Sequence, residues 1–361
     1  MNAIVIGVMA FFMTIGALDR ALFDSRFGYG KEFEKGLNAM GPLALVMVGT
    51  MCAAPALGSF LGPVIGPFFE SIGSDPAMVA GVFLGPDNGG FPLAKSLARS
   101  PEAAALSGIG LASTLGSILT FALPISLSVC SKASQPYVAR GIVAGLIASP
   151  LSMAGVGLAT GCPPLEILRL GAPVFAAALL LAAMLTFRRD LTVRICLKFA
   201  EGLIAVFILL LVYAAFDHYF SLGFVHGMAP IEPQLAIIGE IGIMLSGAFP
   251  FVLFIQKYCT RALHAIAQLL RIDDTAVLGM FVSCANPLPM YSMLDRMSNS
   301  GKVVCSAFSG PVLCLVGDHM GFFSAAFPEG ITPLLAGKLL AAFAALALAL
   351  LMERLWPSRS D

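Results

Sequence analysis

Four ionisable side chains stand inside stretches of the sequence that are otherwise apolar. They are Asp87, Glu240 and the adjacent pair Asp318 and His319. A charge in membrane hydrocarbon is costly, so such residues are candidates for binding or transport. Structural alternatives stay open: Asp87 could cap its own turn, Asp318 and His319 could bond a neighbouring helix, and Glu240 could reach the interface. Lys338 could pair with one of the acids or snorkel to the membrane surface.

Two segments combine the length of a membrane crossing with a break near the middle. Segment 76–98 reads PAMVAGVFLGPDNGGFPLAKSLA and segment 275–297 reads TAVLGMFVSCANPLPMYSMLDRM. We expect Asp75 and Asp274 to cap the first half-helix of each. A half-helix C-terminus carries partial negative charge, and its freed carbonyls survive at membrane depth only in a cavity or packed in protein. These breaks favour a cation, and the candidate substrate-binding residues are Asp87, Asn88, Asn286, Asp318, His319 and Glu240.

The elements that must position these residues are membrane helices. Of the 361 residues, 58% are hydrophobic and 12% are charged, and the mean hydropathy is +0.91. A soluble domain carries about 25% charged residues. A spanning helix needs about 20 apolar residues. Runs close to this length recur at 1–18, 37–61, 103–129, 141–160, 172–187, 202–216, 235–255, 303–327 and 334–351.

The charge distribution indicates whether the two broken segments cross the membrane or re-enter it. If both cross the membrane there are eleven spans, and the Lys and Arg residues other than Lys338 divide almost evenly between the two sides. If both re-enter, only Lys95, Arg99 and Arg169 lie on one side, and the other 17 of those 20 basic residues lie opposite. Because basic residues concentrate on the cytoplasmic side, we predict nine spans in the cell inner membrane, with a periplasmic N-terminus and a cytoplasmic C-terminus.

A weak internal repeat appears when the sequence is shifted by 199 residues. The shift brings Asp75 onto Asp274 and Asp87 onto Asn286, and the order of helices, loops and broken segments agrees. The charges of equivalent loops differ, which predicts two inverted transmembrane repeats, 1–160 and 201–361, joined by a linking helix and loop at 161–200. Paired broken helices in inverted repeats are typical of secondary transporters. Chance similarity between apolar helices is the alternative.

The sequence gives no indication of nucleic-acid binding, of a metal site or of an enzyme. The 21 basic and 21 acidic residues balance, with no basic tail to indicate nucleic acid, and the eight cysteines are scattered without a CxxC pair. Neither a metalloprotease, nor a serine hydrolase, nor an ATP-binding motif is present. We therefore expect no enzyme activity, no metal and no cofactor. Small residues such as Gly108, Gly110 and Ala112 permit close helix packing and a homo-oligomer.

Seven motifs follow one another along the chain: FFMTIGALDR (11–20), FEKGLNAMGPLALVMVG (33–49), LGPVIGPFFESIGSDPAMVAG (61–81), DNGGFPLAKSLA (87–98), ANPLPMYSML (285–294), GKVVCSAF (301–308) and GDHMGF (317–322). Together they resemble the EutH family, the ethanolamine permeases of bacterial ethanolamine-utilisation systems. The resemblance runs from about residue 8 to about 350. It implies a small-molecule substrate, ethanolamine, which is mainly an ammonium at neutral pH and would need a carboxylate or carbonyls for its cation.

Three hypotheses for function remain open. The first is an ethanolamine permease, acting as a facilitator or as an ion-coupled carrier. The second is a transporter for another small amine or amino alcohol. The third is a membrane sensor or scaffold of the utilisation machinery that transports nothing. The sequence does not distinguish proton coupling, sodium coupling and passive flux.

Overall fold

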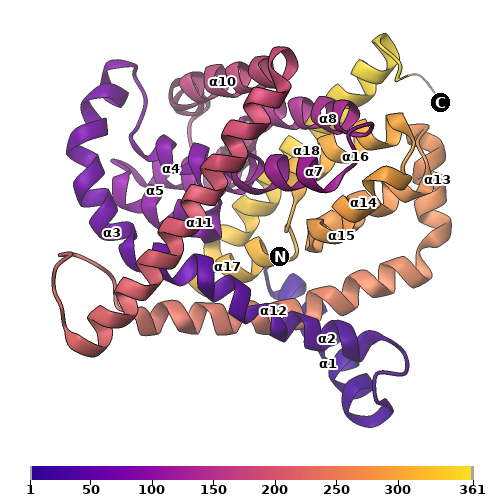
Figure 1. The fold of residues 1–361 in the computed structure, drawn as a ribbon, viewed down its shortest axis with the longest axis horizontal. Helices are drawn as coiled ribbons and strands as arrows, with labels where there is room; N and C mark the ends of the chain where they lie inside the picture. Colours follow the sequence, from indigo (N-terminus) through magenta and orange to yellow (C-terminus); the bar gives the residue numbers. More distant parts are fainter. Residues whose placement is uncertain (1, 359–361) are drawn as a thin grey trace.

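The regular elements of the protein are all helices in residues 2–358, the part of the chain that the computed structural model describes (Figure 1). Residue 1, the start of the predicted first repeat, and residues 359–361, the end of the predicted second repeat, lie outside this part. Eight helical stretches within it are long and apolar enough to cross a membrane. The expectation of an all-helical protein with many membrane crossings is therefore confirmed.

The helices of the first half of the chain are mostly short beyond residue 71, because they are interrupted near Gly and Pro. The elements are α1 (Asn2–Phe23), α2 (Tyr29–Asn38), α3 (Met40–Ser71), α4 (Ala77–Phe83), η1 (Pro86–Gly90), α5 (Phe91–Leu97), α6 (Pro101–Ala105), η2 (Leu106–Gly116), η3 (Ile118–Ala122), α7 (Leu123–Val129), α8 (Gln135–Ala148) and α9 (Leu151–Thr160).

The second half begins with long helices and ends with another interrupted region before the last helix. The elements are α10 (Pro164–Phe187), α11 (Arg189–Phe220), α12 (Ile231–Tyr258), α13 (Thr260–Leu270), α14 (Asp274–Ala285), α15 (Pro287–Met293), η4 (Leu294–Arg296), α16 (Asn299–Val312), α17 (Asp318–Ala326), η5 (Pro328–Gly330) and α18 (Ile331–Leu355).

The predicted continuous helix over 303–327 is wrong. Helix α16 ends at Val312 and α17 begins at Asp318, with Leu313 at a non-helical ψ of 140° and Cys314 at a φ of 54°. The linker between them, residues 313–317, lies against the end of α14, where Cys314 N donates to Ser283 O (3.0 Å) and Val316 N donates to Cys284 O (2.8 Å). These bonds replace the intrahelical ones, so an apolar run that satisfies hydropathy is nevertheless broken in its backbone.

Segment 76–98 folds back on itself as a hairpin. The Asp75 carboxylate accepts a hydrogen bond from Ala77 N (2.9 Å) at the start of α4. The same carboxylate accepts one from Arg99 N (3.2 Å), directly after the segment ends. One side chain therefore holds both ends together, whereas a straight helix of this length would separate them by about 30 Å.

Segment 275–297 is closed in the same way, but by Asp273 and not by the predicted Asp274. Asp273 accepts hydrogen bonds from Ala276 N (3.0 Å) and from Ser298 N (2.9 Å) and Oγ (2.6 Å). A capping residue needs extended backbone, and Asp273 has a ψ of 156°, whereas Asp274 is already helical. The exposed Asp274 carboxylate instead lies 3.0 Å from His264 Nδ1.

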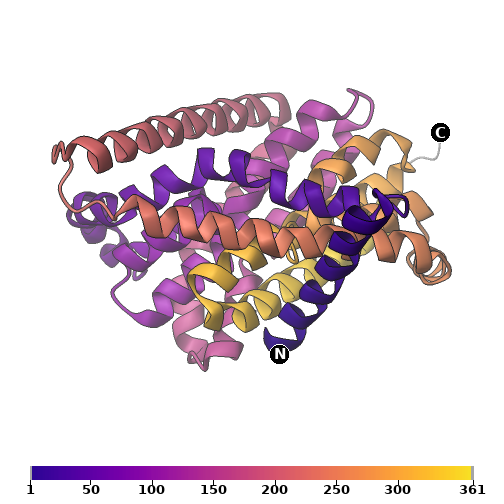
Figure 2. The same ribbon diagram turned by 90° about the horizontal axis from the view of Figure 1, so that it is seen from below.

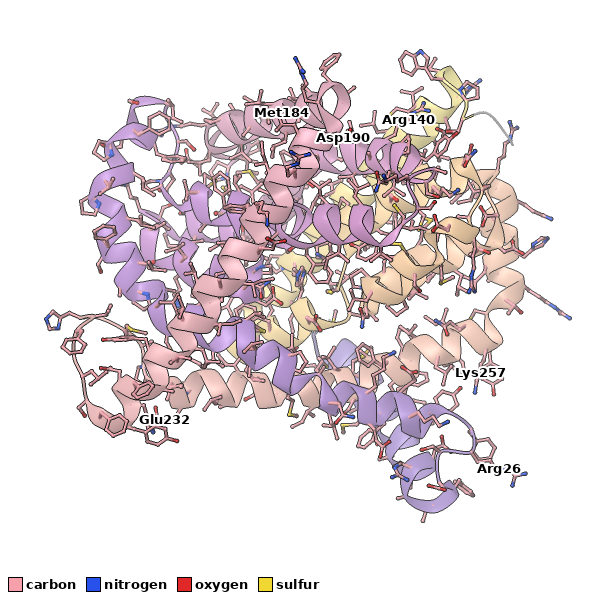
Figure 3. The ribbon with its side chains drawn as sticks, in the orientation of Figure 1. Arg26, Arg140, Met184, Asp190, Glu232 and Lys257 are labelled. Carbon is pink, nitrogen blue, oxygen red and sulfur yellow. The ribbon has the colours of Figure 1, made fainter. Side chains whose placement is uncertain are left out.

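Contacts between distant loops gather at two ends of the molecule. At one end Lys257 donates to Phe27 O, and Asp295 accepts from Ser131 N and Oγ. Hydrogen bonds from Ser134 and Ser131 hold the pKa of Asp295 below its usual value, so this loop contact keeps its ionised carboxylate. Figure 3 shows Arg26, Arg140 and Lys257 toward the right of the view and Glu232, at the far end of α12, at lower left.

The opposite end holds the segments that carry Lys95, Arg99 and Arg169, the three basic residues of the predicted periplasmic side. There Ser74 Oγ donates to Leu170 O (3.1 Å), and Arg99 pairs with Glu70. Every one of these contacts joins segments that the predicted topology assigns to the same side of the membrane.

Apolar side chains cover the outside of the long helices. Helix α11 lies along one side of the molecule (Figure 2), where Leu209, Val212 and Phe216 are exposed. Inside, glycine permits backbones to approach closely: Gly155 of α9 lies against Ala336 and Gly337 of α18. Exposed apolar faces with small residues at helix contacts are the pattern of a protein whose solvent is lipid.

The cap assignment predicts unequal effects of substituting two adjacent aspartates. Asp273→Ala removes the N-cap of α14 and the closure onto Ser298, and should lower stability by about 1–2 kcal/mol. The matched control, Asp274→Ala, removes one exposed pair with His264 and should cost less than about 1 kcal/mol. Thermal unfolding of the detergent-purified variants measures both, and equal losses would contradict the assignment.

Candidate functional site

A cavity of about 340 Å³ lies where the breaks of the two halves meet. Its wall combines α3, η1, η3 and α7 from the first half with α11, the 313–317 linker and α17 from the second. The polar lining residues are Asp87, Asn88, Ser117, Thr120, Glu201, Cys314, Asp318 and His319, and the apolar ones include Leu43, Val46, Phe121, Ile125, Phe207 and Leu313.

The sequence around Asp87 forces the chain out of helical conformation at this depth. Helix α4 ends at Phe83, Leu84 and Gly85 are extended, and Gly89 has a φ of 90°. A left-handed residue is cheap only for glycine, and a Cβ at Gly89 would lie 3.0 Å from Thr50 Cβ. This turn exposes the Asp87 side chain to the cavity while the residue stays 6% exposed overall.

His319 connects Asp87 to a second buried charge. Its Nε2 lies 3.8 Å from Asp87 Oδ1 and 3.5 Å from Ser117 Oγ. Its Nδ1 lies 2.9 Å from Lys338 Nζ, and the same ammonium donates to Ser113 O. An ammonium only donates hydrogen bonds, so Nδ1 accepts and the imidazole proton is on Nε2, facing Asp87. Lys338 therefore meets the acid through the imidazole.

Asp318 brings a second carboxylate into the same cavity. It is the first residue of α17, where a negative charge is favoured by the helix dipole, and Cys314 Sγ lies 3.7 Å from its Oδ2. Asp87 and Asp318 approach the cavity from different halves of the chain, with His319 next to both in the lining. Four of the six predicted residues, Asp87, Asn88, Asp318 and His319, are thus brought together.

The structure does not bring Asn286 and Glu240 to this cavity. Asn286 caps α15, where its Oδ1 accepts from Leu288 N (3.0 Å). Glu240 is exposed on α12 and is absent from the lining. The C-terminal carbonyls of α14, which we expected to favour a cation, instead accept hydrogen bonds from the 313–317 linker.

Sequence reasoning missed several polar members of the site. Ser117 and Thr120 carry no signal beyond being polar in an apolar run, although Ser117 follows a π-helical stretch, a feature frequent at functional sites. Glu201 directly precedes the apolar run 202–216, and it is exposed at the cavity, where its carboxylate pairs with Lys198 (2.7 Å). Lys338 was a candidate partner of an acid, but its contact through His319 depends on the three-dimensional packing.

This arrangement suits a small organic cation that carries a hydroxyl group. Two carboxylates attract the positive charge, the hydroxyls of Ser117 and Thr120 offer hydrogen bonds, and Phe121 and Phe207 supply aromatic faces. Among the described residues, no group of three His, Cys, Asp or Glu side chains is arranged to hold a metal ion.

The chain has relatives among known proteins. Residues 1–352 match the profile of the family described as "Ethanolamine utilisation protein, EutH". The chain belongs to this family. The resemblance that its motifs indicated is confirmed.

The relatives are similar over nearly their whole length. The probable ethanolamine permease EutH of Listeria monocytogenes is 34% identical over 351 residues, covering 97% of this chain and 94% of the relative. The protein of the same name in Escherichia coli is 34% identical over 388 residues, covering 97% and 95%. The uncharacterized protein YxeR of Bacillus subtilis is 33% identical over 342 residues, covering 94% and 91%. No solved structure matches the chain.

Two conclusions follow from the family and the helices together. The protein is a multi-pass membrane protein, because the eight long apolar helices found within residues 2–358 agree with relatives that are named probable permeases. A transporter role is supported by three of the relatives, which are named probable ethanolamine permeases.

Docking of the 313–317 linker on α14 predicts that Gly317 tolerates no side chain. A Cβ at this position would overlap with the Ala285 carbonyl oxygen, which is backbone and cannot move aside. Gly317→Ala should therefore cost about 1–3 kcal/mol and lower the thermal midpoint. In the control Gly171→Ala, the nearest atom would be Met153 Sδ at 3.4 Å, an ordinary contact. A midpoint unchanged in Gly317→Ala would contradict the described packing of the linker.

Proposed function

We propose that the protein carries ethanolamine, as the ethanolammonium ion, across the bacterial cytoplasmic membrane. The observation that carries the proposal is one cavity in which two carboxylates, Asp87 and Asp318, meet beside His319. The names of the relatives support the choice of substrate, since ethanolamine is a small ammonium with one hydroxyl group.

In this proposal the substrate binds with its charge toward the acids. The ammonium lies between the carboxylates of Asp87 and Asp318, and the hydroxyl group pairs with Asn88, Ser117 or Thr120. Apolar walls keep water away from the bound ion, which strengthens its attraction to the carboxylates.

The proposed scaffold has nine crossings in two inverted repeats, 1–160 and 201–361, with 161–200 between them. The interrupted pair α16 and α17 makes one crossing. The hairpins closed by Asp75 and Asp273 enter from opposite sides as re-entrant segments. Two observations support this arrangement. Both hairpins are closed by an aspartate carboxylate, and the two aspartates are 198 residues apart. The first hairpin adjoins the contact between Ser74 and Leu170 at one end of the molecule, and the second adjoins the contact between Asp295 and Ser131 at the other. The N-terminus is periplasmic and the C-terminus cytoplasmic.

Two other functions are compatible with the same cavity. A carrier of another small amine or amino alcohol would use the same two carboxylates. A sensor or scaffold of the utilisation system would bind the amine without moving it. Neither is favoured by a particular contact.

Neutralising Asp87 should abolish transport. In proteoliposomes at acidic pH, where little neutral amine leaks through lipid, Asp87→Asn should reduce labelled ethanolamine uptake at least tenfold, since one lost charge contact is worth about 2 kcal/mol or more. The control Glu102→Gln makes the same acid-to-amide change on exposed α6, outside the cavity, and should transport like the wild type. Undiminished uptake by Asp87→Asn would refute the assigned site.

Competition experiments separate the three functions. If ethanolamine is the substrate, excess choline, serinol or propanolamine should inhibit its uptake less than unlabelled ethanolamine does. Stronger inhibition by one of them would favour that compound as the substrate. Saturable binding without any flux above protein-free liposomes would instead indicate a sensor.

A further inference from the structure

Lys338 is a buried cation that the proposed binding mode leaves unused. It lies about two turns into α18, it is 0% exposed, and it does not line the cavity. Its ammonium donates to Ser113 O of η2 and to His319 Nδ1 of α17. An ionised group at this depth is expensive to keep, so its position calls for a functional account.

The groups that face Lys338 are one imidazole, one carboxylate and two thiols. They are His319 of α17, Asp87 of η1, Cys314 of the linker and Cys284 of α14, and Asp318 lies further along the cavity wall. Helix α9, which also packs on α18, carries no ionisable side chain. Arg140 of α8 lies at the far end of α18, where it pairs with Glu353, and Lys302 of α16 contacts Asn299 and the Tyr137 ring.

These contacts form a continuous proton path between Lys338 and the cavity. Lys338 donates to Nδ1 of His319, and Nε2 on the other side of the ring carries the proton that faces Asp87 and Ser117. When Nδ1 takes a proton from Lys338, Nε2 can give one to water in the cavity. The imidazole then ends neutral with its proton on Nδ1, the amine is neutral, and one proton has left the site.

We propose that Lys338 is the exchangeable proton site of the transporter, so that one alkylammonium ion bound at Asp87 displaces one proton through His319. A second positive charge close to an ammonium favours loss of its proton. Lysine can lose a proton inside a protein, whereas arginine cannot. Because a cation moves one way and a proton the other, transport is electroneutral. This inference rests on the proposed function.

Membrane potential distinguishes this exchange from simple cation flux. Wild-type protein in liposomes, at equal acidic pH on both sides, is given labelled ethanolamine with or without a tenfold outward K⁺ gradient and valinomycin, and uptake into protein-free liposomes is subtracted. The wild type should reach the same level in both conditions. Lys338→Met has no proton to release, so its uptake should follow the inside-negative potential, with about tenfold accumulation for one uncompensated charge.

Two further variants keep the test decisive. His319→Gln keeps a hydrogen-bonding amide but cannot relay a proton, and it should become potential-dependent as well if Lys338→Met fails to fold. Lys95→Met, the same substitution at an exposed position on α5, should remain independent of the potential.

The outcomes separate the two proposals. Wild-type accumulation driven by the K⁺ gradient would overturn the proton exchange and leave ethanolamine transport intact. The exchange would also be overturned if Lys338→Met and His319→Gln both transported without regard to the potential. Wild-type uptake no greater than that of protein-free liposomes would defeat the proposed function and, with it, this inference.

Discussion

The architecture of this protein depends on keeping ionisable groups inside a membrane domain. Asp87 of η1, His319 of α17 and Lys338 of α18 lie in series, and Asp87 comes from the other half of the chain. Each alone would be costly in an apolar interior, and the contact between them offsets part of that cost. The same contact fixes the relative positions of η1, α17 and α18.

This cluster of ionisable groups depends on helices that are interrupted in their backbone. Regular helices crossing side by side would surround such charges with their own side chains and leave no cavity. Here Gly85 and Gly89 turn the chain at η1, and the 313–317 linker starts α17 in the middle of an apolar run. The polar groups that these breaks release are satisfied within the protein, as the linker's hydrogen bonds to α14 illustrate. A hollow with two carboxylates can therefore exist at a depth where lipid surrounds the molecule.

Much of the site could be predicted from residue types, and its geometry could not. Asp87, Asp318 and His319 stand out because charged side chains are rare in apolar runs, and Gly and Pro mark the breaks around Asp87. Hydropathy averages over a window, so it treats 303–327 as one helix although hydrogen bonds to α14 interrupt it. Asp273 and Asp274 are equally good caps in sequence, and only the extended backbone at Asp273 distinguishes them. Lys338 is connected to the cavity by the packing of distant helices, and the sequence around Lys338 does not reveal this contact. Asn286 aligns with Asp87 in the repeat, but it serves as a helix cap.

A structure determined with ethanolamine bound tests the central claim most directly. Cryo-electron microscopy at a saturating ethanolamine concentration should reveal the ligand in the 340 Å³ cavity, with its nitrogen within hydrogen-bonding distance, about 3 Å, of the Asp87 or Asp318 carboxylate. The same density should be absent without the amine. Ligand found elsewhere, for example beside Glu240 on the exposed face of α12, with the cavity unoccupied, would contradict the account.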